Sequence, residues 1–130
     1  MQQSEGGTTG EGEPVADSVR SFDEQAALVR VAGDRELLRE IAAIYLDTYE
    51  AMVQGVRDAA MAGDAVALKS AAHLFKGTVA NFEALNATAV AFELEQMGQH
   101  EQTADAKAKA EELAGEAAQL AAELAAYCAG

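Results

Sequence analysis

Apolar residues recur every three or four positions along most of the chain after residue 35, and this spacing constrains the fold more than any other feature. A helical face repeats roughly every 3.6 residues, so each such run predicts an amphipathic helix with one buried stripe. No segment alternates polar and apolar residues between turn residues, so we expect no strands. The four stripes are Leu38, Ile41, Tyr45, Met52, Val56 and Ala59; Leu68, Ala72, Phe75, Val79 and Phe82; Ala84, Ala87, Ala91, Leu94 and Gly98; and Ala106, Ala110, Leu113, Ala117, Leu120, Leu124 and Tyr127. The chain therefore predicts four long helices.

Turn and capping residues set the limits of these helices. Gly-Asp pairs at residues 33–34 and 63–64 each combine a residue suited to end one helix with a residue suited to cap the next. Ser21 followed by Glu24 fits a capping box, which predicts a short helix over residues 21–31. Short connections between long helices favour antiparallel packing. The predicted fold class is all-α: an antiparallel up-down four-helix bundle with a short N-terminal capping helix.

The first residues differ in composition from the rest of the chain. Residues 1–16 are mostly Gly, Glu, Gln, Ser and Thr and offer almost nothing to bury, so we expect a disordered tail or linker. The helical bundle is then expected over residues 17–130. Aromatic residues within the bundle are candidates for its core: Tyr45, Tyr49, Phe75, Phe82 and Phe92.

The charge and the cysteine content exclude several classes of protein. The formal net charge is −13 and the pI is about 4.3, which disfavours nucleic acids and anionic membrane surfaces as partners. No apolar run approaches the ~18 residues that a membrane-spanning helix needs. The single cysteine, Cys128, cannot form an internal disulfide. We expect a cytoplasmic monomer without membrane insertion and without a bound cofactor or metal.

The segment around His73 combines a nucleophile with cations. On a helical projection His73 lies well off the apolar stripe, and Lys69 and Lys76, four residues before and three after, lie next to it. A neutral imidazole can attack phosphorus and form a phosphoramidate. Two ammonium groups would disfavour the imidazolium and stabilise the phosphoryl oxygens. Gly77 faces away from the core and would let a docking partner approach.

Nothing else near His73 suggests catalytic machinery. The sequence places no nucleotide-binding loop, general-base carboxylate or magnesium cluster in evident proximity to it. The Gly-rich run at residues 6–12 lacks the Lys-Ser/Thr ending of a phosphate-binding loop. The phosphoryl chemistry would therefore have to be completed by a partner.

Three short segments share one stretch of the chain: His-Leu-Phe-Lys-Gly-Thr at residues 73–78, Asn-Phe-Glu-Ala at residues 81–84 and Leu-Glu-Gln-Met-Gly at residues 94–98. Together they resemble histidine-containing phosphotransfer (HPt) domains of bacterial multistep phosphorelays. The resemblance covers about residues 21–127. Phe75 stands where the family usually has leucine, and Glu83 stands where it usually has glycine, which puts the turn before the next helix in question.

The resemblance implies a phosphorelay intermediate. His73 would accept a phosphoryl group from a receiver-domain phospho-aspartate and transfer it to another receiver aspartate. Lys76 and Gly77 match motif positions, and Lys69 is an additional cation outside the motif. The implied partners are response-regulator receiver domains, which would carry Mg²⁺, and a hybrid histidine kinase.

Other functions remain open on the sequence. One is a substrate domain that a histidine-kinase catalytic domain phosphorylates directly, a type that usually places an acidic group against the histidine; no such group is obvious here. Another is a non-catalytic helical adaptor, in which His73 would be incidental. A carboxylate-bridged metal bundle is disfavoured, because neither His73 nor His100 has a glutamate three residues before it.

Overall fold

A computed structural model describes residues 21–130, and these residues form five helices and no strand. The all-α prediction is therefore confirmed over this range, whereas the predicted tail at residues 1–16 lies outside the described residues. The helices are α2 (Glu24–Arg30), α3 (Arg35–Ala62), α4 (Ala65–Ala80), α5 (Leu85–Gln99) and α6 (Ala106–Ala129).

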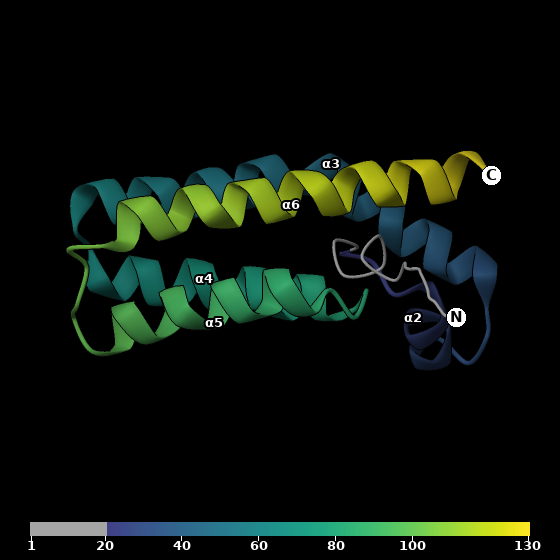
Figure 1. Ribbon diagram of the computed structural model, residues 1–130, viewed down its shortest axis with the longest axis horizontal. Coiled ribbons are helices and arrows are strands. Elements are labelled where there is room, and N and C mark those ends of the chain that lie inside the picture. Colours follow the sequence, from purple (N-terminus) through teal and green to yellow (C-terminus); the bar gives the residue numbers. More distant parts are fainter. Residues whose placement is uncertain (1–20) are drawn as a thin grey trace, which may run out of the picture.

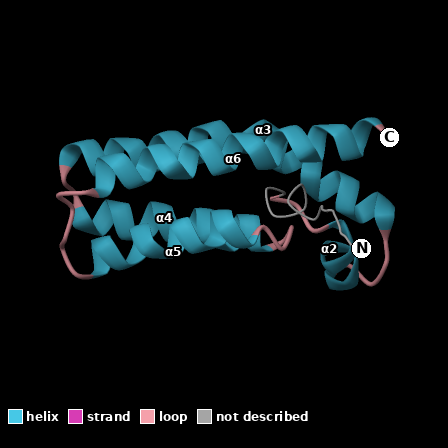
Figure 2. Ribbon diagram, in the orientation of Figure 1, coloured by secondary structure: helices cyan, strands magenta, loops and turns pink. Residues whose placement is uncertain are grey.

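The four long helices lie in two pairs. Figure 1 shows α3 beside α6 and α4 beside α5, with each helix running opposite to the one before it. In addition, α3 packs against α4 and α5 against α6, so every long helix has two neighbours. The short α2 lies near the end where α3 begins and α6 finishes, and short loops join the helices (Figure 2).

Aspartate caps begin three of the helices. Asp34 and Asp64 accept hydrogen bonds from the backbone N–H three residues on, at α3 and α4, as the two Gly-Asp pairs predict. Gly63 closes α3 in the left-handed region at φ 65°, where glycine carries no Cβ penalty.

The prediction that Ser21 caps the first helix is wrong. Asp23 caps α2 instead and accepts a hydrogen bond from Ala26 N–H. Ser21 is buried before the helix, where its backbone N–H and that of Phe22 donate to the Glu123 carboxylate of α6. The backbone of Ser21 thus contacts a residue about 100 positions away in sequence and lies outside the helix.

The core follows the helical stripes. Every residue of the stripe from Leu68 to Phe82 has no solvent exposure, although α4 itself ends at Ala80. Tyr45 is buried and donates a hydrogen bond from its hydroxyl to the Ala117 carbonyl at 2.9 Å. Burial, and secondarily Tyr49, raises the pKa of the Tyr45 hydroxyl, so this group stays protonated and keeps donating.

Phe92 departs from the core prediction. Its side chain is 48% exposed and lies on the outer surface of α5.

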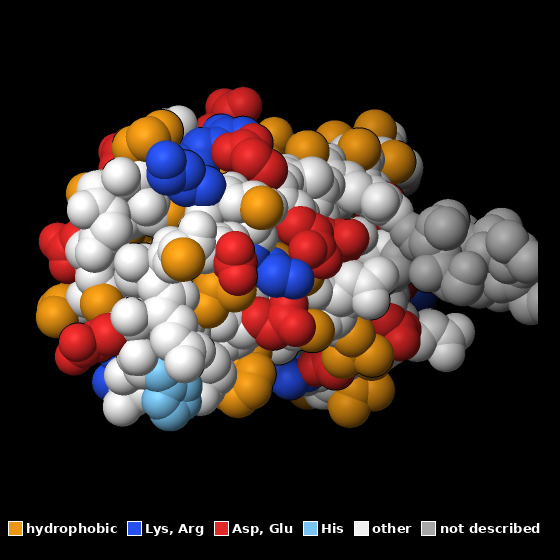
Figure 3. Space-filling model, turned by 60° about the vertical axis from the view of Figure 1, so that its left-hand side comes forward, with side chains coloured by type: hydrophobic (Ala, Val, Ile, Leu, Met, Phe, Trp, Pro, Cys, Tyr) orange, Lys and Arg blue, Asp and Glu red, His pale blue; other side chains and the backbone are white. Residues whose placement is uncertain are grey.

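Figure 3 shows that most Lys and Arg side chains on the face drawn lie against Asp or Glu rather than forming a continuous basic patch. Within residues 21–130, no helix is long and apolar enough to cross a bilayer.

Candidate functional site

His73 projects from the middle of α4 on the side away from the core. Its neighbours on the opposite side of the helix, Leu68, Ala72 and Phe75, are fully buried, whereas the His73 side chain is 69% exposed. The periodicity of α4 fixes this outcome, because burying the apolar stripe leaves residue 73 in solvent. The imidazole is therefore accessible to a docking molecule.

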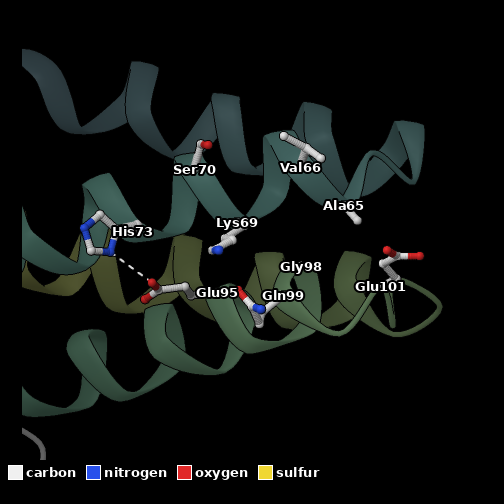
Figure 4. Close-up of a pocket in the computed structure, with 9 residues that line it drawn as sticks. All are labelled: Ala65, Val66, Lys69, Ser70, His73, Glu95, Gly98, Gln99 and Glu101. Atoms are coloured by element: carbon white, nitrogen blue, oxygen red, sulfur yellow. Dashed lines mark hydrogen bonds and ion pairs between the residues drawn. The ribbon is translucent and has the colours of Figure 1, made fainter.

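Glu95 on α5 holds the imidazole. Its Oε2 lies 2.9 Å from His73 Nδ1, as the dashed line in Figure 4 marks. An ionised carboxylate only accepts hydrogen bonds, so Nδ1 carries the proton and donates. In the neutral imidazole, the other ring nitrogen, Nε2, then carries the lone pair. The carboxylate thus selects the imidazole nitrogen that can act as a nucleophile.

The same carboxylate binds Lys76. Its Oε1 lies 2.7 Å from Lys76 Nζ, and the Glu95 side chain is only 13% exposed. The Lys76 ammonium is the largest influence on the Glu95 carboxyl and lowers its pKa; partial burial opposes this, and His73 lowers the pKa further. Glu95 therefore stays ionised at neutral pH and keeps both contacts.

This pairing changes the electrostatics expected from the sequence. The two lysines are not equivalent neighbours of His73, because Lys76 is neutralised by Glu95. Lys69 is exposed and forms no ion pair with any residue in the described range 21–130. Figure 4 shows its side chain extending between α4 and α5, close to Glu95 and His73. Lys69 is thus the lysine of the pair whose charge is available to an incoming anion.

An open groove of about 510 Å³ lies beside His73 between α4 and α5. Lys69, Ser70, Glu95 and Gly98 are among its lining residues, together with His73 itself. The groove places the free Lys69 ammonium and the His73 ring around one shared space (Figure 4).

Gly98 sets how closely the two helices of the site approach. A Cβ at this position would lie 2.6 Å from the Lys69 backbone nitrogen and 2.7 Å from the Ala65 carbonyl oxygen. Both are backbone atoms that cannot move aside, so only glycine fits. The contact between α4 and α5 that brings Glu95 to His73 therefore depends on a missing side chain one turn along α5.

Gly77 has a different environment. Within the described part of the chain, no atom outside its own helical neighbourhood lies within 4 Å of the place where a Cβ would sit. Packing inside the protein therefore does not require glycine here, although glycine costs helix stability. Leu74 and Val66, also on α4, are 61% and 79% exposed.

Glu83 explains how the turn before α5 tolerates the loss of the usual glycine. Its φ is 51°, in the left-handed region that glycine adopts more readily. Its carboxylate pairs with Arg30 of α2 at 2.6 Å. The turn keeps the conformation that glycine favours, and the side chain ties it to the short helix.

Sequence reasoning missed Glu95. It lies in the Leu-Glu-Gln-Met-Gly segment, beside the core residue Leu94, but a helical projection relates residues of one helix only. The sequence shows no obvious acidic group near His73, but the structure places Glu95 against it. Of the residues singled out from the sequence, His73 and Lys76 meet at Glu95, Lys69 lines the neighbouring groove, and Gly77 lies apart from both contacts.

Comparisons with known proteins agree with the helical architecture. The structure matches that of histidine-containing phosphotransfer protein B (HptB) from Pseudomonas aeruginosa PAO1, with a TM-score of 0.77 and 22% identity over 85% of this chain and 96% of that chain. A search of curated proteins gives no significant match. The Hpt domain family matches residues 40–129, a range that includes all of α4 and α5 and therefore both His73 and Glu95. The chain therefore belongs to the Hpt domain family.

Proposed function

We propose that this protein is a phosphorelay intermediate in which His73 accepts a phosphoryl group from a receiver-domain phospho-aspartate and passes it to another receiver aspartate. One observation carries the proposal: an exposed imidazole whose Nδ1 is held by a carboxylate at 2.9 Å, which leaves Nε2 as the nucleophile. Membership of the Hpt domain family supports the same assignment.

The transfer step balances without an added proton carrier. The Nε2 lone pair attacks the phosphorus of the acyl phosphate, an N–P bond forms, and the P–O bond to the aspartate breaks. The aspartate leaves as a carboxylate, and the phosphorylated ring, which keeps its Nδ1 proton, acquires positive charge. The Glu95 carboxylate stabilises that charge through its hydrogen bond to Nδ1. The same steps in reverse then transfer the phosphoryl group from His73 to the aspartate of a second receiver.

Lys69, Lys76 and Gly77 support the transfer in separate ways. Lys69, unpaired in the groove beside His73, is placed to attract the phosphoryl oxygens. Lys76 holds the Glu95 carboxylate ionised. Gly77 leaves the helix surface bare for a close-fitting partner.

A receiver domain is the partner that this surface suits. The exposed apolar side chains of Val66 and Leu74 flank His73 on α4 and offer contacts to a docking protein. In this proposal Mg²⁺ belongs to the receiver; residues 21–130 contain no group of three His, Cys, Asp or Glu side chains arranged to hold a metal ion.

We place the phosphotransfer unit, an up-down four-helix bundle that acts as a cytoplasmic monomer, at residues 17–130, with residues 1–16 as a tail or linker.

A label-transfer experiment tests the proposal. A receiver domain carrying ³²P on its aspartate is mixed with the protein, and the label is followed onto the protein and then onto a second receiver. Phosphohistidine survives alkali and is lost in acid. His73→Gln is the control: it keeps docking but has no nucleophilic nitrogen, so label should be absent. Label that persists in this variant, or absence of label on the unaltered protein with every receiver tried, contradicts the proposal.

The Glu95–His73 contact also favours a second candidate function. An acidic group against the histidine is the feature expected of a domain that a histidine-kinase catalytic domain phosphorylates directly from ATP. Incubation with a kinase catalytic domain and ATP, without any receiver, separates the two. Labelling under these conditions at a rate above that from phospho-receiver would favour the second candidate.

A further inference from the structure

Phe92 lies at an unusual place for a phenylalanine. It is half exposed on α5, three residues before Glu95, and therefore on the same side of that helix. The Lys76 Nζ lies 5.2 Å from the centre of its ring. The Lys76 ammonium is thus enclosed by two groups of α5, the ring face of Phe92 and the carboxylate of Glu95.

We propose that Phe92 is a positioning residue of the phosphotransfer site: its ring face holds the Lys76 ammonium against Glu95, and Glu95 in turn holds the His73 imidazole. The inference rests on the proposed function of His73. The links in the series are Phe92 to Lys76 at 5.2 Å, Lys76 to Glu95 at 2.7 Å and Glu95 to His73 at 2.9 Å.

The physical basis is a cation–π interaction. A lysine side chain is a flexible four-carbon stem that carries a point charge, so an ion pair alone does not fix the direction from which its ammonium approaches. A ring face within about 6 Å of the ammonium adds attraction in a defined direction. Lys76 is only 27% exposed in this arrangement. Phe92 therefore reduces the freedom of Lys76 to leave Glu95 for solvent.

The charged groups around Glu95 allow the effect to be isolated. From α4, His73 and Lys76 contact the carboxylate, and Lys69 lines the same groove. From α6, Lys109 is engaged by Glu93 and Glu112 instead. Lys76 is the largest cause of the lowered Glu95 pKa, so a change in its position is reported by that carboxyl.

Three variants test the proposal in the full chain. Phe92→Leu keeps an apolar side chain but removes the ring face, Phe92→Trp restores a ring face, and Leu85→Ala alters another exposed apolar residue of α5 as a control. Carboxyl NMR titration should show that the pKa of Glu95 rises towards its usual range in Phe92→Leu. In Phe92→Trp and Leu85→Ala the pKa of Glu95 should stay as low as in the unaltered protein. The rate of label transfer to His73 should fall about two- to fivefold in Phe92→Leu and recover in Phe92→Trp.

The outcomes separate this inference from the proposed function. An unchanged Glu95 pKa in Phe92→Leu overturns the positioning of Lys76 by the ring, whatever the transfer rates. A raised pKa with an unchanged transfer rate overturns the role in transfer while leaving the function of His73 intact. A protein that accepts no label at all, with intact folding by thermal denaturation, overturns both the proposed function and the role that depends on it.

Discussion

Glu95 serves two neighbours with one carboxylate, one oxygen for the His73 ring and the other for the Lys76 ammonium. Exchanging Glu95 for Gln keeps the size of the side chain but removes its charge. Charge-assisted hydrogen bonds are roughly twice as strong as neutral ones, so we expect label transfer to His73 to slow about tenfold. Initial transfer rates measure the effect. Glu93→Gln, on the same helix but paired with Lys109, is the matched control and should transfer normally.

The lowered pKa of Glu95 also has a consequence for stability. A carboxyl whose folded-state pKa lies below its usual value of 4.5 stabilises the fold above that value, and the contribution is lost as the pH falls from 4.5 through the lowered pKa. The unaltered protein should therefore lose more stability than Glu95→Gln over this acid range. Urea unfolding at neutral pH and below pH 4.5 provides the comparison. Equal losses in the two proteins would show that Glu95 gains nothing from its partners.

Individual residues also mark the limit of what the sequence could reveal. The positions of His73 and Phe75 relative to the core follow from the repeat of one helix and were predicted correctly. Glu95 and Phe92 owe their roles to how α5 is rotated against α4, which no single-helix pattern contains. Phe92 was assigned to the core on its apolar character alone, but its ring faces a lysine.

At the scale of the helices, the close approach of α4 and α5 depends on Gly98. Exchanging Gly98 for Ala would drive a methyl group into the α4 backbone, and overpacking of this kind costs about 1–3 kcal/mol. Chemical denaturation should show that loss of stability. Gly115→Ala on α6 is the control, because an added Cβ there would meet no described atom outside its own stretch of helix within 4 Å, and it should stabilise the protein by up to about 1 kcal/mol. A stable Gly98→Ala variant would mean that the helices separate easily.

A second pair of glycines separates helix stability from docking. Gly77 and Gly55 both lie within helices, and no described residue would contact a Cβ at either position. Alanine at either position should therefore raise the free energy of unfolding by about 0.5–1 kcal/mol. We expect only Gly77→Ala to slow transfer from a receiver, because only that position adjoins His73. Equal transfer rates in the two variants would remove partner approach as the reason for Gly77.

Helix limits were predictable where the signal is local. The Gly-Asp pairs predicted the beginnings of α3 and α4 because capping involves residues within one turn. The beginning of α2 was not predicted correctly: Ser21 was expected to cap this helix, but Asp23 caps it and the Ser21 backbone N–H donates to Glu123 of α6. Long-range contacts of this type carry no signature in the adjoining sequence.

At the scale of the whole molecule, hydrogen bonds to Glu123 connect the start of the described chain to the last helix. Its carboxylate accepts hydrogen bonds from the backbone N–H groups of Ser21 and Phe22, and the Phe22 ring packs against Phe82 and Tyr127. Exchanging Glu123 for Ala leaves two amides without this acceptor, so we expect about 1–3 kcal/mol of destabilisation. Thermal or urea unfolding measures it. Label transfer by the folded fraction should be unaffected, because these hydrogen bonds involve no residue of the His73 site.

These hydrogen bonds also supply a native spectroscopic reporter. The amide protons of Ser21 and Phe22 are protected from exchange while they are hydrogen-bonded to Glu123. The rate of deuterium uptake at these two positions therefore measures how often these hydrogen bonds break, without any attached dye. Comparing that uptake before and after a receiver binds would reveal whether docking at the imidazole is felt at the far end.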